Sequence, residues 1–281
     1  MDRDGPAPPV RDAQAFLGGV ERALLHPIRP EKGEGLSVGL DLGTASIVLV
    51  VLGEGGRPLA AAREFARVVR DGLVVDFDRA RLIVKALRER LQDALAVELN
   101  ETAIAVPPGT GARDVATHSY VASGAGLEVT GVMDEPAAAN LVLGMRSGAI
   151  VDIGGGTTGV SLLKDGRIVH SFDEPTGGTH VTLVLAGHNR ISFEEAEALK
   201  LDPKRGRENL AVIAPVLRKM GSIIKNGISG FECERIVLVG GTAATEGIEG
   251  IIAMETGKTV SVSPVPLLVT PAGIALGNRR T

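Results

Sequence analysis

Aromatic residues and cysteine are scarce in this chain, and each shortage excludes some classes of function. Only 2% of the 281 residues are aromatic, with no tryptophan and a single tyrosine, Tyr120. Bases therefore find few rings on which to stack, and a net charge of −4 provides no basic surface, so the composition argues against a nucleic-acid partner. Cys233 is the only cysteine, which excludes an internal disulfide framework and a cysteine-based metal cluster. We interpret it as a small residue before a strand, not as a catalytic thiol.

Long apolar runs are absent as well. No run approaches the roughly 20 residues that a membrane-spanning helix needs, and residues 1–6 lack the basic and apolar regions of a signal peptide. We therefore expect a cytoplasmic protein without a membrane partner. What the chain does have is Val, Ile, Leu and Ala in quantity, within a hydrophobic fraction of 44%. This composition favours parallel strands buried on both faces, and the length is sufficient for two lobes with their own cores.

The most informative motif lies at residues 150–163, which read IVDIGGGTTGVSLL. An apolar run ends at Asp152, three glycines and two threonines follow, and a second apolar run leaves. Glycines allow a turn whose successive N–H groups converge on an anion. Because Asp152 would repel a bare phosphate, a hydrated Mg²⁺ between the carboxylate and the phosphate is expected. The turn at Asp165-Gly166 predicts a β-hairpin after the glycines, so this is a strand–turn–strand phosphate loop.

The same pattern occurs once before, at Asp41, which is followed by Gly43, Thr44 and another apolar run. Asp41 and Asp152 lie 111 residues apart, and each heads a three-strand unit. An internal repeat of this kind indicates two similar lobes facing each other, with two loops that grip a polyphosphate from both sides. For either loop alone, the alternative is a tight glycine hairpin with an exposed Asp, because short motifs often match by chance.

We divide the chain into three parts. Residues 1–35 form an N-terminal extension with a short amphipathic helix over 12–25 and then a linker, residues 36–146 form the first lobe, and residues 147–281 form the second lobe, whose last helix packs back toward a hinge. The amphipathic helix docks either on this protein's own surface or on a partner, because such a helix is marginal alone. If the helix contacts a partner, one hypothesis is that it directs encapsulation of this protein within a larger assembly.

Glu135 is the candidate catalytic acid of the first lobe. With Asp134 before it and Pro136 after it, it begins a helix directly after a strand. At the carboxyl edge of a sheet, where open α/β sheets bind ligands, an acid can orient the water that attacks a γ-phosphate. An ordinary helix start explains the same residues, and the residues alone leave both interpretations open.

The second lobe has further local signals. The segment Thr176–His180 introduces a helix whose free N–H groups would add to the anion site, with His180 as a capping residue. Ser192 and Glu195 form a capping box at the start of the next helix. A long amphipathic helix follows, which we expect Pro215 to interrupt. The strand at 235–239 then ends in a Gly240-Gly241 turn, with a helix expected from Ala243 onward.

Together these motifs resemble the actin-like ATPase superfamily, which includes DnaK-type chaperones, MreB, FtsA and sugar kinases. The five characteristic blocks of that superfamily correspond in order to residues 41–46, 134–139, 152–158, 239–242 and 271–277. The resemblance implies a duplicated α/β fold of ribonuclease H-like lobes facing a nucleotide cleft, with reduced subdomain insertions. It also implies that Asp41 and Asp152 hold hydrated Mg²⁺ and that Glu135 positions the hydrolytic water. The nucleotide contacts that it implies are Gly43, Thr44, Ala45, Gly154, Gly155, Gly156, Thr157, Thr158, Gly177, Gly178, Glu197, Lys200, Gly240 and Gly241.

Longer segments, among them VVRDGLVVDF (68–77) and TGGTHVTLVLAGHNRISFEEAEALK (176–200), are similar to the EutJ family of ethanolamine-utilisation proteins. The resemblance covers residues 36–276. It implies ATP and Mg²⁺ as cofactors, a chaperone-like role beside a bacterial microcompartment, and a cobalamin-dependent lyase or a shell component as protein partner. There is no long lid insertion after Lys200, and Thr242-Ala243-Ala244 stands where an adenine-stacking Arg is common, so we expect weak ATPase activity. The alternatives are a scaffolding or filament-type structural protein and a small-molecule phosphotransferase.

Overall fold

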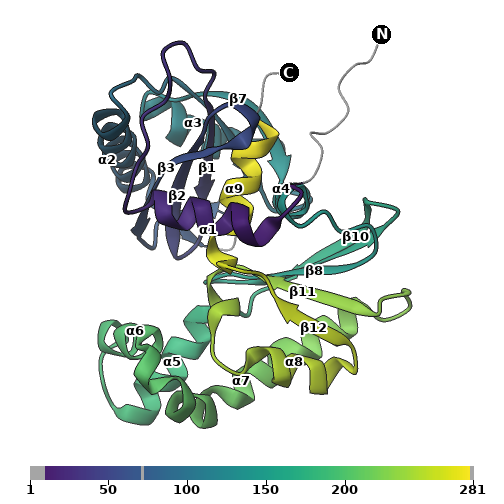
Figure 1. The fold of residues 1–281 in the computed structure, drawn as a ribbon. Helices are drawn as coiled ribbons and strands as arrows, with labels where there is room; N and C mark the ends of the chain where they lie inside the picture. Colours follow the sequence, from purple (N-terminus) through teal and green to yellow (C-terminus); the bar gives the residue numbers. More distant parts are fainter. Residues whose placement is uncertain (1–9, 71–72, 279–281) are drawn as a thin grey trace. The chain divides into compact units, whose positions relative to one another are not determined.

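The computed structural model describes residues 10–70 and 73–278. The chain divides into two compact units, which Figure 1 shows coloured along the sequence. Unit 1 comprises Met1–Gly144 and Leu268–Thr281, and unit 2 comprises Met145–Leu267. Residues 268–278 therefore group with unit 1, where the sequence analysis counted the last helix with the second lobe and expected it to pack back toward a hinge.

Unit 1 is built on a five-stranded sheet with the order β3-β2-β1-β6-β7. The first three strands form an antiparallel meander, and the last two run parallel to β1. Helices α2 and α3 cover one face with the main apolar core, while α9 and α4 pack on the other (Figure 1). The strands are β1 (Ser37–Leu42), β2 (Ser46–Leu52), β3 (Pro58–Phe65), β6 (Glu101–Val106) and β7 (Glu128–Asp134). The helices are α2 (Phe77–Leu95), α3 (Ala112–Gly124), α4 (Glu135–Leu143) and α9 (Val269–Gly277), and a small ladder joins β4 (Val69–Arg70) to β5 (Leu73–Val74).

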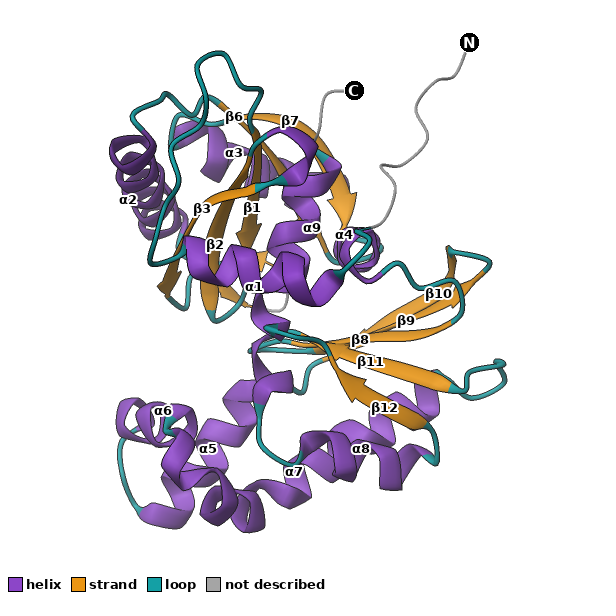
Figure 2. Ribbon diagram, viewed as in Figure 1, coloured by secondary structure: helices purple, strands orange, loops and turns teal. Residues whose placement is uncertain are grey.

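Unit 2 repeats this plan, with the strand order β10-β9-β8-β11-β12. Again the first three strands form an antiparallel meander and the other two run parallel to the first of them. Its helices gather on one face of the sheet (Figure 2) and share one apolar core with it. The strands are β8 (Gly148–Ile153), β9 (Thr158–Lys164), β10 (Arg167–Glu174), β11 (Arg235–Val239) and β12 (Thr259–Val262). The helices are α5 (Gly178–Asn189), α6 (Phe193–Leu201), α7 (Gly206–Gly227) and α8 (Ile248–Thr256).

The amphipathic helix of the extension docks on unit 1 itself. It forms α1 (Ala13–Ala23), with Asp12 as N-cap, and its Leu17 and Val20 are fully buried where α1 packs against β3. Gly19 lies close against Pro58, because a Cβ there would be 3.1 Å from the proline ring. Docking on the protein's own surface is therefore the correct alternative. Residues 1–9, with their three prolines, lie outside the described residues.

Two expectations about helices in unit 2 are corrected. Helix α7 continues through Pro215 instead of being interrupted there. Pro215 and Ala211, whose carbonyl loses its intrahelical donor, are both on the exposed side, so water can satisfy that carbonyl while the buried apolar face holds the helix together. The residues after Gly240 form only the 3-10 turn η3 (Gly241–Ala244), and the helix expected there begins at Ile248.

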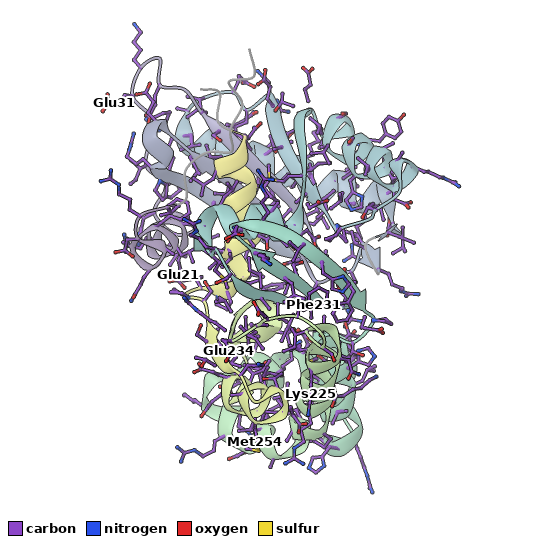
Figure 3. All side chains as sticks on the ribbon, turned by 90° about the vertical axis from the view of Figure 1, so that its right-hand side faces the viewer. Glu21, Glu31, Lys225, Phe231, Glu234 and Met254 are labelled. Atoms are coloured by element: carbon purple, nitrogen blue, oxygen red, sulfur yellow. The ribbon has the colours of Figure 1, made fainter. Side chains whose placement is uncertain are left out.

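Cys233 is buried just before β11, as interpreted from the sequence. Its Sγ lies 3.5 Å from the Arg235 carbonyl oxygen, and burial raises the pKa of the Cys233 thiol, against the opposing effect of nearby Lys258. Lys258 also pairs with Glu234 at 3.2 Å, and the Glu234 side chain, labelled in Figure 3, is largely exposed. Within the described residues, no helix is both long and apolar enough to cross a membrane.

Candidate functional site: two matching glycine loops

The two glycine loops have the same geometry, each within its own unit. In the first, Leu42 pairs with Ile47, and in the second, Ile153 pairs with Thr158, so each hairpin encloses four residues, 43–46 and 154–157. Each is closed by the same hydrogen bond, from the first N–H of the loop to its fourth carbonyl. These bonds measure 3.0 Å between Gly43 N and Ser46 O and 3.1 Å between Gly154 N and Thr157 O. The sequence repeat is therefore a structural repeat.

Both loops leave N–H groups available. Within the described residues, the backbone N–H groups of Gly155, Gly156 and Thr157 have no hydrogen-bond partner, and neither have those of Thr44 and Ala45. All five residues are at least partly accessible to solvent. Consecutive N–H groups in such a turn form a concave donor site suited to an anion. Each loop therefore has the arrangement of donors that an anion such as phosphate requires.

A carboxylate precedes each loop at the carboxyl edge of its sheet. Asp41 pairs with Val48 across the β1–β2 hairpin, and Asp152 pairs with Gly159 across the β8–β9 hairpin. Both are the last residue but one of their strands and are partly buried. Because β6 and β7 run parallel to β1, Glu135, the first residue of α4, lies at the same edge of unit 1 as Asp41. The structure thus brings Asp41 and Glu135 to one sheet edge, and their roles remain predictions.

The second loop is held from behind by the start of α5. The Gly154 carbonyl accepts from the Gly178 N–H at 2.9 Å, and the Gly155 carbonyl accepts from the Thr179 N–H at 2.8 Å. The Gly177 N–H donates to Nδ1 of His180 at 3.3 Å, which confirms His180 as a capping residue. The expectation of free N–H groups at this helix start is therefore wrong. These N–H groups already donate to the loop carbonyls and to His180. Gly177 and Gly178 would therefore affect ligand binding only indirectly, by holding the loop in place.

Glycine is required at two positions around this loop. A Cβ on Gly177 would lie 2.7–2.8 Å from backbone atoms of residues 154–156, which cannot move aside without deforming the loop. Gly240 has a φ of +86°, and a Cβ there would collide with the Asp152 carboxylate and lie 2.6 Å from the Ile153 carbonyl oxygen. The turn after β11 and the start of α5 thus enclose the phosphate loop within unit 2.

Glu197 and Lys200 form an ion pair on α6, with Nζ–Oε1 at 2.7 Å. Thr182 of α5 joins them, because its hydroxyl donates to Glu197 Oε2 at 2.5 Å and lies 3.0 Å from Lys200 Nζ. Thr182 is not among the residues predicted from the sequence, although its position four residues after Gly178 places both on one face of the helix. The cluster lies beside Gly178, whose N–H holds the second loop, because Lys200 Nζ would be 3.6 Å from a Cβ built on Gly178.

Asp173 is a further acid that the sequence analysis missed. It pairs with Gly159 across the β9–β10 hairpin, and its carboxylate accepts a hydrogen bond from the Thr157 side chain in the loop. Although much of the residue is exposed, desolvation of this carboxylate raises the pKa of Asp173, more than the Thr157 contact lowers it. The Asp165-Gly166 turn predicts the hairpin, but the register shift between Ile168 and His170, which brings Asp173 opposite Gly159, has no signal in the local sequence.

Family models match both halves of the chain. The model described as cell division protein FtsA matches residues 149–270, and the MreB/Mbl protein model matches residues 61–194. The ethanolamine utilization protein EutJ of Escherichia coli (strain K12) is 38% identical over 245 residues, which covers 87% of this chain and 86% of that one. The chain belongs to the EutJ family. The resemblance seen in the sequence motifs is thereby confirmed.

Solved structures agree with this assignment. The crystal structure of EutJ from Carboxydothermus hydrogenoformans has a TM-score of 0.90 and 45% identity, covering 94% of this chain and 98% of that one. MreB5 of Spiroplasma citri, solved bound to ADP, has a TM-score of 0.68 and 18% identity, covering 85% of this chain and 94% of that one. At that identity the likeness concerns the fold alone. The EutJ-family chain therefore has the duplicated α/β fold of the actin-like ATPases, as expected.

Proposed function

We propose that this chain binds MgATP through its two glycine loops, hydrolyses it slowly, and acts as a chaperone-like protein in ethanolamine utilisation. In this proposal the nucleotide engages one loop from each unit, and the movement that it causes controls the hold on a protein partner. The observation that supports nucleotide binding is the pair of loops. They share a register and a closing hydrogen bond, they offer N–H groups without partners, and each follows a carboxylate.

The donor set fits a magnesium-bound polyphosphate. N–H groups bind phosphate oxygens, whereas Asp41 and Asp152 would repel a bare phosphate. Within the described residues, no group of three or more His, Cys, Asp or Glu side chains could hold a metal ion by itself. Mg²⁺ characteristically takes one or two carboxylates and completes its shell with water and substrate phosphates. When bound, it would neutralise phosphate charge at the ends of β1 and β8.

Backbone N–H groups that bind phosphate do not distinguish one base from another, so the choice of ATP rests on the family and on the ADP present in the MreB5 structure. Glu135, at the same sheet edge as Asp41, is proposed to orient the attacking water. Slow hydrolysis is proposed because the first-lobe insertion that carries the catalytic Lys of the DnaK-type chaperones is absent, and weak nucleotide binding because Thr242-Ala243-Ala244 lacks the adenine-stacking Arg common in the superfamily. The partner follows from the family names of the relatives, which concern ethanolamine utilisation. We propose a cobalamin-dependent lyase or a microcompartment shell component.

Calorimetric titration tests nucleotide binding. MgATP is titrated into the wild-type protein, into Asp41→Asn and into Asp152→Asn. Losing one charge-assisted metal contact should weaken binding roughly ten- to a hundredfold. The matched control is Asp165→Asn, which removes an acidic charge from the far turn of the β9–β10 hairpin, where a φ of +51° suits Asn. No binding by the wild type, or equal binding by all four proteins, would refute the proposal.

Partner control needs a separate measurement. The purified lyase and purified shell proteins are passed over the immobilised full-length chain with MgATP, with MgADP and without nucleotide. We expect at least one of them to be retained in amounts that differ between the three conditions. Identical retention of every candidate in all three conditions would contradict nucleotide control, even if calorimetry had shown nucleotide binding.

A further inference from the structure

Thr242 donates a side-chain hydrogen bond to the second phosphate loop from a distant part of the chain. It lies in η3, the turn after β11, and its side chain is buried, with 6% of the residue exposed. Its Oγ1 is 2.8 Å from the carbonyl oxygen of Gly154, 88 residues earlier. That carbonyl also accepts from the Gly178 N–H, so both of its lone pairs are occupied.

These two hydrogen bonds determine where the next N–H points. The Gly154 carbonyl and the Gly155 N–H belong to one planar peptide group, and the described residues contain no cis peptide bond. In a trans peptide the C=O and N–H directions are opposed. Fixing the carbonyl toward Thr242 and Gly178 therefore turns the Gly155 N–H away from them. This N–H is one of the loop's donors without a partner.

We infer that Thr242 is a positioning residue for the second phosphate loop: its hydroxyl holds the Gly154 carbonyl and thereby aims the Gly155 N–H at a phosphate oxygen of the bound nucleotide. The inference deepens the proposed function and rests on it. The turn does not need this hydroxyl for its own shape, because the Thr242 carbonyl accepts from the backbone N–H of Thr245 at 3.0 Å and from its hydroxyl at 2.7 Å. The hydroxyl of Thr242 is therefore free to serve the loop.

The experiment compares variants of the full chain by MgATP calorimetry and thermal denaturation. Thr242→Val keeps the shape but removes the hydroxyl, and Thr242→Ser keeps the hydroxyl. Thr245→Val is the matched control, because it removes a hydroxyl of the same turn that bonds to Thr242 and not to the loop. If Thr242→Val does not fold, Thr242→Ala, which adds no bulk, is measured in its place.

We expect Thr242→Val to weaken MgATP binding about three- to tenfold, the loss of one aligned hydrogen bond. Thr242→Ser should restore the affinity, and Thr245→Val should lower the melting temperature without changing the affinity. The inference is overturned if Thr242→Val and Thr242→Ala bind MgATP as the wild type does, or if Thr245→Val loses as much affinity. Absence of MgATP binding by the wild type would instead refute the proposed function.

Discussion

Gly273 of α9 lies against the backbone of Ala138 in α4, so that a Cβ on Gly273 would overlap the Ala138 carbonyl group. The same helix also lies close to β1, because a Cβ on Gly39 would overlap the Ala275 backbone nitrogen and lie 2.8 Å from the Pro271 carbonyl oxygen. Two helices and a strand of unit 1 thus touch backbone to backbone. The small residues of α9 are needed for this packing, which joins the last segment of the chain to the first unit.

We therefore predict that Gly273→Ala destabilises the protein by at least about 2 kcal/mol, because the methyl group meets backbone that cannot move aside locally. Urea denaturation measures the change. The control is Gly250→Ala in α8, where a Cβ meets no atom within 4 Å and the better helix former should stabilise by about 0.5–1 kcal/mol. Equal effects of the two substitutions would show that helix packing does not determine the residue at 273.

Replacing Pro215 in α7 should stabilise the protein. Pro215→Ala restores an N–H donor to the exposed Ala211 carbonyl and removes the proline ring. In a helix interior, replacing Pro by Ala lowers the free energy of the folded state by up to about 3 kcal/mol. Greater freedom of the unfolded chain offsets about 1 kcal/mol, so we expect a net gain of about 1–2 kcal/mol. Lys219→Ala, one turn further along the same exposed face, should change the unfolding free energy by less than about 0.5 kcal/mol. A loss of stability in Pro215→Ala would contradict this account.

Asp173 should make stability depend on pH. Its pKa is raised in the folded protein because desolvation disfavours the carboxylate. The folded state therefore holds this proton to higher pH than the unfolded state does, and stability falls as pH rises from the ordinary Asp pKa through the raised one. Asp173→Asn should accordingly raise the melting temperature at neutral pH, with the advantage disappearing below the ordinary Asp range. An advantage that does not vary between acidic and neutral pH would contradict desolvation as the cause.

Cys233 should react slowly with thiol reagents in the native protein. Burial raises its pKa and blocks access, so the reactive thiolate is scarce near neutral pH. Ellman's reagent should modify Cys233 much more slowly in native buffer than in denaturant, where the same single thiol is the internal control. Rapid modification of the native protein would mean that the segment before β11 opens readily. It would also contradict the interpretation of Cys233 as an unreactive structural residue.

Local patterns in the sequence were sufficient for most elements. Alternating or continuous apolar runs with Gly turns predicted the strands, Asp165-Gly166 predicted the hairpin turn with both residues at positive φ, and Ser192 with Glu195 predicted the observed capping box. The repeat of Asp41 and Asp152 predicted two similar units. The hairpin turn and the capping box depend on torsional preferences and hydrogen bonds between residues a few positions apart, so nearby residues determine them. The repeat is a comparison of two segments 111 residues apart, and it could be read because each segment carries the same local motif.

The tertiary structure decided which distant groups satisfy one another. Sequence alone could not assign the N–H groups of α5 to the loop carbonyls, the Thr242 hydroxyl to Gly154, or Asp173 to the side of Thr157, because each pair is set by packing across 16 to 88 residues. Tertiary packing also keeps α7 continuous at Pro215 and places α9 in the first unit. Burial energy summed over many contacts outweighs one local preference. The sequence by itself therefore determined the helices, the strands and the glycine loops. Only the tertiary structure determined which distant groups hold the second loop in its orientation.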